Sequence, residues 1–427
     1  MESIIVCGGN PLRGEVTVEG AKNSALKLMA AALMVPGITR LTNVPDIADV
    51  AIMSEVLEGL GARVTRSDHT LQIDASVLTS HDAPYEHVVR MRASTAVLGP
   101  LVSRLGRARV AHPGGCNIGS RKIDMHIRGL EALGVRIEFD HGYICATAPE
   151  GGMRPARVVL DFPSVGATEN LLMASVLGNG TTVIENAARE PEIVDLADLL
   201  SAAGARISGA GSPTITIEGV ESLQHVEHRV VGDRVEAGTF LVAGALTGGP
   251  VTVRGFSPAH LDIVIAKLQQ AGCDVVVEDD AATISRSGAI RSVDVQTLPY
   301  PGFPTDMQAQ FMALMALGDG GSIITENVFE NRFMFADELS RMGADIRIEG
   351  HHALVKGVST LSGAPVMSTD LRGGAALVLA ALVAHGETVV GEIHHIDRGY
   401  ERFCDKLASL GASVRRESDT TDYDGVC

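Results

Sequence analysis

One short pattern occurs six times along the 427-residue chain: Leu, three residues, Gly, a small residue, any residue, then Val or Ile. Successive copies are 68 to 73 residues apart, as their glycines show: Gly61, Gly134, Gly204, Gly272, Gly343 and Gly411. Each copy predicts the end of a helix followed by a strand, because glycine adopts the left-handed conformation there without a Cβ clash. Such regular spacing indicates six copies of one structural unit.

A second, apolar helix is predicted in each unit, before a Gly turn and a short strand. Residues 171–176 and 376–383, for example, are almost entirely apolar. Helices that are apolar all round belong inside a core, whereas those at 46–60 and 192–203 carry charge on one face and are expected outside. Each unit thus reads as strand, buried helix, strand, outer helix, strand, an α/β arrangement unlike a Rossmann sheet. Six units divide most simply into two domains of three.

Composition and charge narrow the class of function. Hydrophobic residues make up 45% of the chain and charged residues 20%, which suffices for sizeable cores. The net charge of −17 argues against general binding of nucleic acid or anionic membranes. No uncharged apolar run approaches the roughly 18 residues that span a bilayer, and the first residues lack a signal peptide's basic segment. We therefore expect a cytoplasmic protein with no nucleic-acid or membrane partner, of unknown oligomeric state.

The cysteines and histidines do not form a metal-binding pattern. No CxxC pair occurs, so we expect reduced thiols and no disulfide framework. The adjacent histidines at 351–352 and 394–395, like His225 and His228, lack a convergent set of Cys or carboxylate ligands and are expected to be solvated. No metal and no cofactor are predicted. The six cysteines are Cys7, Cys116, Cys145, Cys273, Cys404 and Cys427.

The segments just before the buried helices are rich in cap residues, glycine and charge. Helix N-termini expose unpaired N–H groups and the positive end of the dipole, so several that converge would bind an anion. Ser, Thr and Asp at these places also serve as ordinary N-caps. A positive charge there opposes the dipole, however, and Lys22, Arg92 and Arg372 occupy such places. An anionic ligand is therefore indicated.

The loops that leave the paired strands each carry an arginine: Arg121, Arg189, Arg332 and Arg398. The guanidinium group is suited to bidentate capture of carboxylate and phosphate. An ion pair within the protein fits Arg189 equally well, because Glu190 follows it.

Cys116 lies in a Gly-rich, polar segment at 113–119, with Arg121 five residues on, a setting that favours the thiolate. Most lone cysteines are inert core residues, but this one is not in an apolar run. The glycines at 114, 115 and 119 leave the backbone free to change its angles. We expect a lid that closes over an anionic ligand and brings Arg121 inward.

Taken in order, these segments resemble the MurA branch of the EPSP synthase superfamily, over nearly the whole chain up to about residue 416. The motifs are Gly-Ala-Lys-Asn at 20–23, Met-Arg-Ala-Ser at 91–94, Pro-Gly-Gly-Cys at 113–116, Ile-Gly-Ser-Arg at 118–121, Ile-Asp-Met-His at 123–126, Phe-Pro-Ser-Val-Gly-Ala-Thr at 162–168, Glu-Asn-Ala-Ala-Arg-Glu-Pro at 185–191, Phe-Pro-Thr-Asp at 303–306, Glu-Asn-Arg-Phe at 330–333 and Asp-Arg-Gly-Tyr at 397–400. The resemblance implies transfer of the enolpyruvyl group of phosphoenolpyruvate to the 3′-hydroxyl of UDP-N-acetylglucosamine, with release of phosphate. That reaction is the first committed step of peptidoglycan precursor synthesis.

The resemblance also implies the fold and the place of the active site. It predicts two inside-out α/β domains, each of three repeated units with buried helices, and an active site in the cleft between them. The first domain would span residues 21–231, and the second would combine residues 1–20 with 232–427. The acidic tail after about residue 416 is expected to be disordered.

Roles follow from the resemblance residue by residue. Lys22, Arg121 and Arg398 would clamp the phosphate and carboxylate of phosphoenolpyruvate. Cys116 would protonate its C3 and can itself add to it, and Asp306 would be the candidate base at the sugar 3′-hydroxyl. The implied substrate-binding residues are Lys22, Asn23, Arg92, Arg121, Lys122, Ile123, Asp124, Met125, His126, Phe162, Pro163, Ser164, Val165, Gly166, Asp306, Val328, Phe329, Arg332, Asp370 and Arg372.

Two positions vary within the family. Some members carry Lys at the position of Phe162, near the nucleotide phosphates, and some actinobacterial members carry Asp at the position of Cys116. Sensitivity to fosfomycin is therefore expected here. Three alternatives stay open: an EPSP synthase, which would not be expected to have the Pro-Gly-Gly-Cys loop; a paralogue acting on a different nucleotide; and a catalytically silent repeat scaffold.

Overall fold

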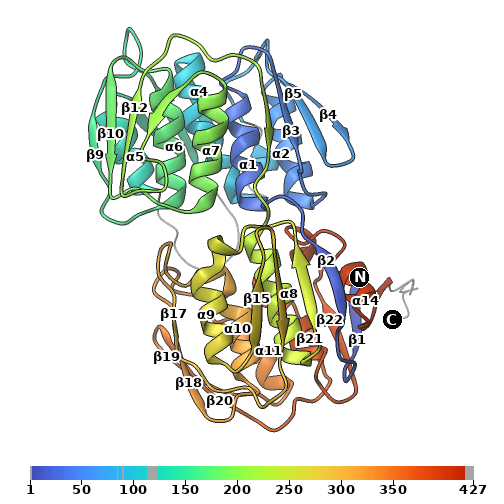
Figure 1. The fold of residues 1–427 in the computed structure, drawn as a ribbon. Coiled ribbons are helices and arrows are strands. Elements are labelled where there is room, and N and C mark those ends of the chain that lie inside the picture. The colour runs from blue at the N-terminus through green and yellow to red at the C-terminus, as the bar shows by residue number, and fades with distance from the viewer. Residues whose placement is uncertain (1, 84, 89–90, 113–122, 419–427) are drawn as a thin grey trace, which may run out of the picture.

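The computed structural model describes residues 2–83, 85–88, 91–112 and 123–418, and these form two lobes (Figure 1). Each lobe has its own core of buried apolar side chains. One core draws on residues 25–230, and the other on residues 4–18 together with residues 235–410. The domain boundaries expected at residues 20 and 231 stay a prediction.

The first lobe packs its helices inside three small sheets. Its helices are α1 (Lys22–Ala32), α2 (Ala48–Gly59), α3 (Tyr85–Val88), the 3-10 helix η1 (Arg92–Val97), α4 (Leu98–Leu105), α5 (Asp124–Ala132), α6 (Val165–Val176) and α7 (Pro191–Ala202). Its strands are β3 (Ile38–Thr42), β4 (Arg63–Ser67), β5 (Thr70–Asp74), β6 (Arg107–Ala111), β7 (Arg136–Asp140), β8 (Tyr143–Thr147), β9 (Arg157–Val159), β10 (Thr181–Glu185), β11 (Arg206–Ser208), β12 (Thr214–Glu218) and β13 (Val226–Arg229). In the described residues the sheet orders are β13-β3-β5-β4, β6-β8-β7 and β11-β12-β10-β9.

The second lobe repeats this arrangement and includes the start of the chain. Its helices are α8 (Arg234–Thr247), η2 (Pro258–Leu261), α9 (Asp262–Gln270), η3 (Thr305–Met307), α10 (Gln308–Met315), α11 (Ala336–Arg341), α12 (Leu371–Ala381), α13 (His394–Asp397) and α14 (Phe403–Ser409). Its strands are β1 (Glu2–Cys7), β2 (Gly14–Thr17), β14 (Val251–Arg254), β15 (Asp274–Val277), β16 (Ala281–Ser285), β17 (Val295–Gln296), β18 (Gly321–Thr325), β19 (Asp345–Glu349), β20 (His352–Lys356), β21 (Pro365–Met367), β22 (Glu387–Gly391) and β23 (Ser413–Ser418). The sheet orders over the described residues are β21-β22-β1-β23, β15-β16-β14-β2 and β17-β18-β20-β19.

Over the described residues, the sheets have one more strand than the sequence predicts, apart from the three-stranded sheet β6-β8-β7. In the unit of α6, β9 pairs in parallel with β10, and the chain after α7 forms an antiparallel hairpin of β11 and β12. The predicted helix ends are confirmed: the six repeat glycines all have positive φ angles, between 88° and 106°. The predicted buried helices are confirmed as well, since every residue of α12 is buried.

One helix predicted to lie outside is largely buried. Two of the three charged side chains of α7 do not face solvent: Glu192 is 4% exposed and Asp195 is 7% exposed, whereas Asp198 is exposed. Glu192 accepts two hydrogen bonds from Arg234, at 3.0 and 3.1 Å, and Asp195 pairs with His228 at 2.7 Å. The charged face predicted for this helix therefore consists mainly of side chains in ion pairs inside the protein.

The first strands of the chain complete sheets formed mainly by the second half. β1 pairs antiparallel with both β22 and β23, so that Ile4 lies opposite Val390 on one side and Arg416 on the other. β2 pairs in parallel with β14. β23 ends at Ser418, and the rest of the tail expected to be disordered lies outside the described residues.

The two lobes are joined where Gly20 and Gly232 form an antiparallel bridge. A Cβ on Gly20 would lie 1.9 Å from the carbonyl oxygen of Asn43, and one on Gly232 would lie 1.9 Å from that of Gly255. Only glycine permits so close an approach of the backbones. Among the described residues, no helix combines the length and apolar character needed to cross a bilayer.

Candidate active site

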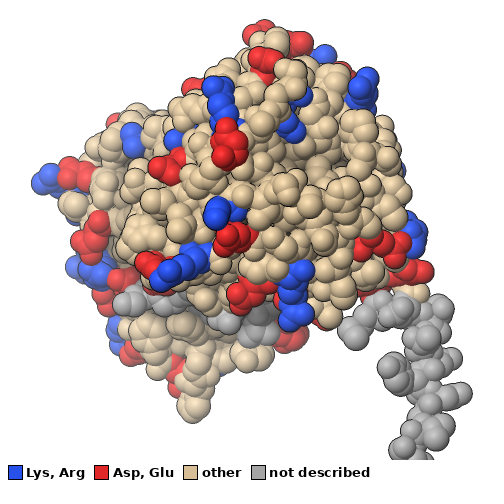
Figure 2. Space-filling model, turned by 90° about the horizontal axis from the view of Figure 1, so that it is seen from below, with Lys and Arg blue, Asp and Glu red and all other residues tan. Residues whose placement is uncertain are grey.

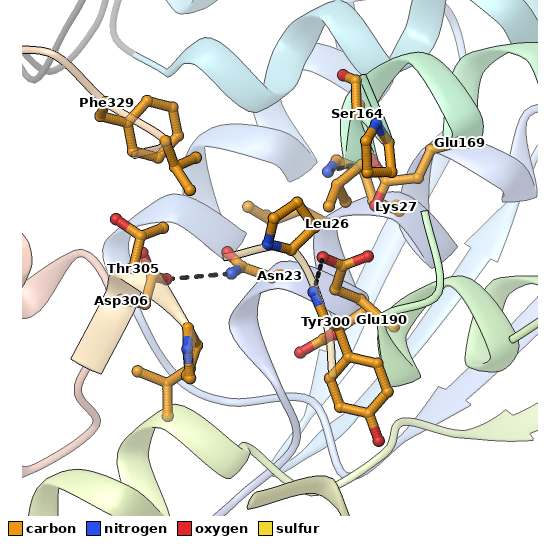
Figure 3. A pocket seen from close by; sticks show the side chains of 18 of the residues that line it. Asn23, Leu26, Lys27, Ser164, Glu169, Glu190, Tyr300, Thr305, Asp306 and Phe329 are labelled. Carbon is orange, nitrogen blue, oxygen red and sulfur yellow. Dashed lines mark hydrogen bonds and ion pairs between the residues drawn. The ribbon is translucent and has the colours of Figure 1, made fainter. Parts of the chain in front are cut away.

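A cavity of about 690 Å³ lies between the lobes. The first lobe contributes the starts of α1 and α6 and the segment that leads into α5, while the second contributes η3, the start of α12 and the segment around Phe329. Figure 3 shows Asn23, Lys27 and Glu169 from one lobe facing Thr305, Asp306 and Phe329 from the other. Figure 2 shows basic side chains next to acidic ones over the described part of the face seen from below.

Two of the helices that begin at the cavity, α6 and α12, have the side-chain caps that the sequence predicts. Ser164 Oγ accepts from the backbone N–H of Ala167 at 3.3 Å, at the start of α6. Asp370 Oδ1 accepts from the backbone N–H groups of Arg372 and Gly373, at 2.9 and 3.1 Å, at the start of α12. These cap residues thus satisfy N–H groups that no helical partner reaches.

Two of the basic residues predicted to bind an anion, Lys22 and Arg398, share one carboxylate partner. Lys22 Nζ lies 2.8 Å from Asp49 Oδ2, and the guanidinium of Arg398, from the other lobe, contacts the same carboxylate through Nε at 2.9 Å and Nη2 at 3.3 Å. Asp49 is 1% exposed. Two cations from different lobes therefore converge on one anion, an arrangement that suits a bound phosphate or carboxylate equally well.

The protonation of this cluster follows from burial and charge. Burial alone would raise the pKa of Asp49, but the charges and hydrogen bonds of Lys22 and Arg398 outweigh it and hold the pKa below its usual value. Burial lowers the pKa of Lys22, against the attraction of Asp49 and with the repulsion of Arg398.

Asp306 lies between two buried arginines. Arg332 Nη2 donates to Oδ1 at 2.7 Å, Arg372 Nη2 donates to Oδ2 at 3.1 Å, and Asn23 Nδ2 lies 3.5 Å from Oδ2 across the lobes (Figure 3). Burial would raise the pKa of Asp306, but Arg332 and Arg372 outweigh it and hold the pKa below its usual range. The carboxylate is thus ionised at neutral pH and oriented by donors on both oxygens.

Two further carboxylates, Glu169 and Glu190, line the cavity on the side of the first lobe. Lys27 Nζ donates to Glu169 Oε2 at 2.6 Å, and Glu190 Oε1 accepts from the backbone N–H of Tyr300, across the lobes, at 3.3 Å (Figure 3). Within the described part of the chain, Glu169 Oε1 and Glu190 Oε2 are buried and have no hydrogen-bond partner. Burial raises the pKa of both carboxyl groups. They are acceptors available to the hydroxyl or amide hydrogens of a ligand.

Most of the predicted site residues line this one cavity. They are Lys22, Asn23, Ile123, Asp124, Met125, His126, Phe162, Pro163, Ser164, Val165, Gly166, Asp306, Val328, Phe329, Arg332, Asp370, Arg372 and Arg398. Cys116, Arg121 and Lys122 lie outside the described residues, as does the loop predicted to be a lid. Arg92 begins η1, but its side chain is outside the description. Arg189 is not among the lining residues, whereas its neighbour Glu190 is.

Known proteins that are similar to this chain identify its family. The family model described as EPSP synthase (3-phosphoshikimate 1-carboxyvinyltransferase) matches residues 6–407. The chain belongs to the EPSP synthase family. Two curated relatives identify the branch: a UDP-N-acetylglucosamine 1-carboxyvinyltransferase 2 of Carboxydothermus hydrogenoformans is 54% identical over 98% of this chain and 100% of its own length. The UDP-N-acetylglucosamine 1-carboxyvinyltransferase of Corynebacterium jeikeium is 53% identical over 97% of this chain and 99% of its own.

Solved structures show the same fold. The enolpyruvyl transferase NikO from Streptomyces tendae has a TM-score of 0.88 at 28% identity, covering 97% of this chain and 98% of that one. An EPSP synthase from Acinetobacter baumannii has a TM-score of 0.78 at 17% identity, with 98% and 100% covered, and shows the fold alone. The predicted EPSP synthase-like fold of repeated α/β units is thereby confirmed, as is the resemblance to the family.

Sequence reasoning missed several residues of this family member's cavity. Asp49, the partner of the two clamp cations, reads in the sequence as an ordinary acidic residue in the first turn of α2. Glu169 lies in an apolar helix, where a buried carboxylate is uncommon, and that contrast is a signal that could have been used. Glu190 was interpreted in the sequence only as a possible ion-pair partner of Arg189. In the described residues no group of three potential metal ligands occurs.

Proposed function

We propose that this protein transfers the enolpyruvyl group of phosphoenolpyruvate to the 3′-hydroxyl of UDP-N-acetylglucosamine and releases phosphate. One observation carries the proposal: a chain related over 98% of its length to a UDP-N-acetylglucosamine 1-carboxyvinyltransferase joins clamp cations, an oriented carboxylate and capped helix starts in one interlobe cavity. The reaction begins the synthesis of peptidoglycan precursors. Since its substrates are small soluble anions, we place the protein in the cytoplasm.

The reaction divides into an addition and an elimination. In the addition, the 3′-oxygen forms a bond to C2 of phosphoenolpyruvate, the hydroxyl loses its proton, and C3 gains one. In the elimination, C3 loses a proton, the bond from C2 to the phosphate oxygen breaks, and the double bond re-forms as phosphate leaves. The negative charges on phosphate and carboxylate require cations throughout, a role that Lys22 and Arg398 fill, with Arg121.

The anion that these cations now contact is part of the protein. Asp49 occupies the position between Lys22 Nζ and Arg398 at hydrogen-bond distances. A bound phosphate or carboxylate would add its charge beside Asp49 and draw both cations toward it. The clamp is thus held in place before substrate arrives, so that binding orders few additional side chains.

Asp306 accepts the hydrogen bond of the 3′-hydroxyl. Because Arg332 and Arg372 hold its pKa low, the paired carboxylate is a good acceptor but a weak base. If the substrate hydroxyl replaced one of the two arginine contacts, the pKa of Asp306 would rise and its carboxylate would become a stronger base. Asn23 of the first lobe, whose Nδ2 lies near Asp306 Oδ2, positions the sugar next to this carboxylate.

Phosphate release tests the assignment. The purified protein with phosphoenolpyruvate should release phosphate with UDP-N-acetylglucosamine, and only weakly with other uridine nucleotides or with shikimate 3-phosphate. A preference for another nucleotide would identify a paralogue, and release with shikimate 3-phosphate an EPSP synthase. Absence of turnover with every acceptor would identify a silent scaffold.

Cys116 is expected to be the most reactive of the six cysteines toward alkylating agents and fosfomycin-like epoxides. Burial raises the pKa of Cys273 and of Cys404 to about 11, which leaves little thiolate at neutral pH. Peptide mapping after limited alkylation, with and without UDP-N-acetylglucosamine, measures the effect. Cys116→Ser should lose the labelling and most turnover, whereas Cys116→Asp should keep turnover because a carboxylic acid also donates a proton.

Cys7 and Cys145, which are partly exposed, are the internal controls for that experiment. Preferential labelling of either of them, or labelling of Cys116 that is indifferent to the sugar nucleotide, would contradict the assignment.

A further inference from the structure

The Asp-Arg-Gly-Tyr motif ends in a residue whose side chain lies in the core of the second lobe. Arg398 of this motif lines the cavity, but Tyr400 is 2% exposed. Its ring packs against Phe403 with a centroid separation of 4.8 Å. A buried phenol requires a hydrogen-bond partner, since an unpaired hydroxyl in a core is destabilising. The partners of this one come from the buried helices of the repeats.

Three polar groups meet in the core of the second lobe. The hydroxyl of Tyr400 lies 3.0 Å from Oγ1 of Thr239, which belongs to α8. Gln310, which belongs to α10, donates from Nε2 to Thr239 Oγ1 at 3.0 Å and to the Tyr400 hydroxyl at 3.3 Å. Thr239 and Gln310 are both fully buried. These groups form a closed triangle between helices that contact each other (Figure 1).

The available hydrogens fix the direction of the bonds in this triangle. Thr239 Oγ1 lies 2.8 Å from the carbonyl oxygen of Val235, to which its single hydrogen is donated. The oxygen of Thr239 then only accepts, so the hydroxyl of Tyr400 must donate to it. Nε2 of Gln310 is the donor in the other two bonds. Burial raises the pKa of Tyr400, against the attraction of Arg372, so the phenol keeps this hydrogen at neutral pH.

The ring of Tyr400 connects this triangle to the cavity. Arg372, which is 2% exposed, places its guanidinium carbon 5.2 Å from the centroid of the ring, within the range of a cation–π contact. The same guanidinium donates from Nη2 to Asp306 Oδ2 at 3.1 Å.

We propose that Tyr400 is a positioning residue for the transferase reaction: anchored by Thr239 and Gln310, it holds Arg372 where that side chain orients Asp306. This inference rests on the proposed function for its catalytic consequence. The contacts run from the triangle of Thr239, Gln310 and Tyr400 in the core to the ring of Tyr400. From there they continue through the guanidinium of Arg372 to the carboxylate of Asp306 at the cavity. A displacement of Arg372 would release one of the two donors that orient Asp306.

Two substitutions at Tyr400 separate the hydroxyl from the ring. Tyr400→Phe removes the anchor and should lower kcat about tenfold, while Tyr400→Leu also removes the face that contacts Arg372 and should lower kcat about a hundredfold. In both variants KM for phosphoenolpyruvate should change less than about threefold, because the clamp of Lys22 and Arg398 is untouched. Phe240→Leu is the matched control: it makes a similar cavity in the same core but removes neither a member of the triangle nor the ring that faces Arg372, and kcat should stay near the wild-type value.

A second pair of variants acts on the anchor without changing the ring. Thr239→Val removes the acceptor of the phenol and should reproduce the loss of Tyr400→Phe, whereas Thr239→Ser retains the hydroxyl and should retain kcat. If kcat in Tyr400→Leu and Thr239→Val falls no further than in Phe240→Leu, or if KM rises in proportion, the positioning role is refuted.

Crystal structures of the two Tyr400 variants test the inference without reference to turnover. The guanidinium of Arg372 should move away from Asp306 Oδ2 in Tyr400→Leu and show a second position in Tyr400→Phe. An unchanged contact between Arg372 and Asp306 in both variants would overturn the inference even in an active enzyme. Wild-type protein that shows no turnover, together with the displaced arginine, would overturn the proposed function and leave the positioning of Arg372 standing.

Discussion

Replacing Arg398 with alanine is expected to lower kcat/KM for phosphoenolpyruvate by about 10²- to 10³-fold, as loss of a preorganised electrostatic donor does in other enzymes. The guanidinium is the only part of the clamp that the described second lobe brings to Asp49, through contacts at 2.9 and 3.3 Å. Without it, the clamp retains only its first-lobe cations to meet the charge that develops on the transferring group. Steady-state phosphate release measures the loss.

The matched control for this variant is Arg415→Ala. Arg415 lies in β23 of the same lobe, is largely exposed, and pairs with Glu387 at 3.5 Å. Its removal should leave kcat/KM unchanged, since exposed ion pairs contribute little to stability. Lys22→Ala should resemble Arg398→Ala, because it removes the other partner of Asp49. Near-normal kcat/KM in both clamp variants would remove the clamp from the account.

Replacing Asp306 with asparagine should abolish most turnover while binding of UDP-N-acetylglucosamine persists. The substitution keeps the shape and one acceptor oxygen but removes the charge, so kcat should fall by about 10²- to 10⁴-fold, the usual range for a lost acid–base group. Calorimetric titration with the sugar nucleotide measures binding, and phosphate release measures kcat. Unchanged kcat, or a loss of binding that explains the whole effect, would contradict the assigned role.

The stability of this variant needs its own control. Breaking a buried ion pair costs about 3–5 kcal/mol when one charge is left alone. Arg332 and Arg372, 4% and 2% exposed, both lose their carboxylate in Asp306→Asn. Thermal unfolding of the variant should therefore be compared with that of Asp337→Asn, which alters an exposed carboxylate in α11. A lowered midpoint in a protein that still binds the sugar nucleotide is the expected result.

Local features of the chain made much of the fold predictable. The glycine that ends each outer helix, such as Gly204 with φ of 106°, is a requirement of local geometry and so is visible in sequence. The buried helices can also be predicted from their own sequence, because a helix with no polar face is stable only inside the protein. The cap role of Ser164 and Asp370 is likewise a matter of two or three neighbouring residues.

Contacts between distant segments could not be read from the sequence. Asp49 and Arg398 are separated by 349 positions, and nothing near Asp49 distinguishes it from any other acid early in a helix. Glu190 gains its role from Tyr300 of the other lobe, and Tyr400 from helices far from it in the chain. The charged face of α7 was misread for the same reason, since the partners of Glu192 and Asp195 lie in later elements. The expectation that the N-terminal strand joins the second domain came from the family resemblance, not from the repeat, and its pairing with β22 and β23 was not predicted.

A competition experiment tests the central claim most directly. The protein is incubated with phosphoenolpyruvate and equal concentrations of UDP-N-acetylglucosamine and shikimate 3-phosphate, and the enolpyruvyl products are identified by mass spectrometry alongside the phosphate released. The account predicts a single product, enolpyruvyl-UDP-N-acetylglucosamine, in an amount equal to the phosphate. Enolpyruvyl transfer to shikimate 3-phosphate, or phosphate release without a modified sugar nucleotide, would contradict it.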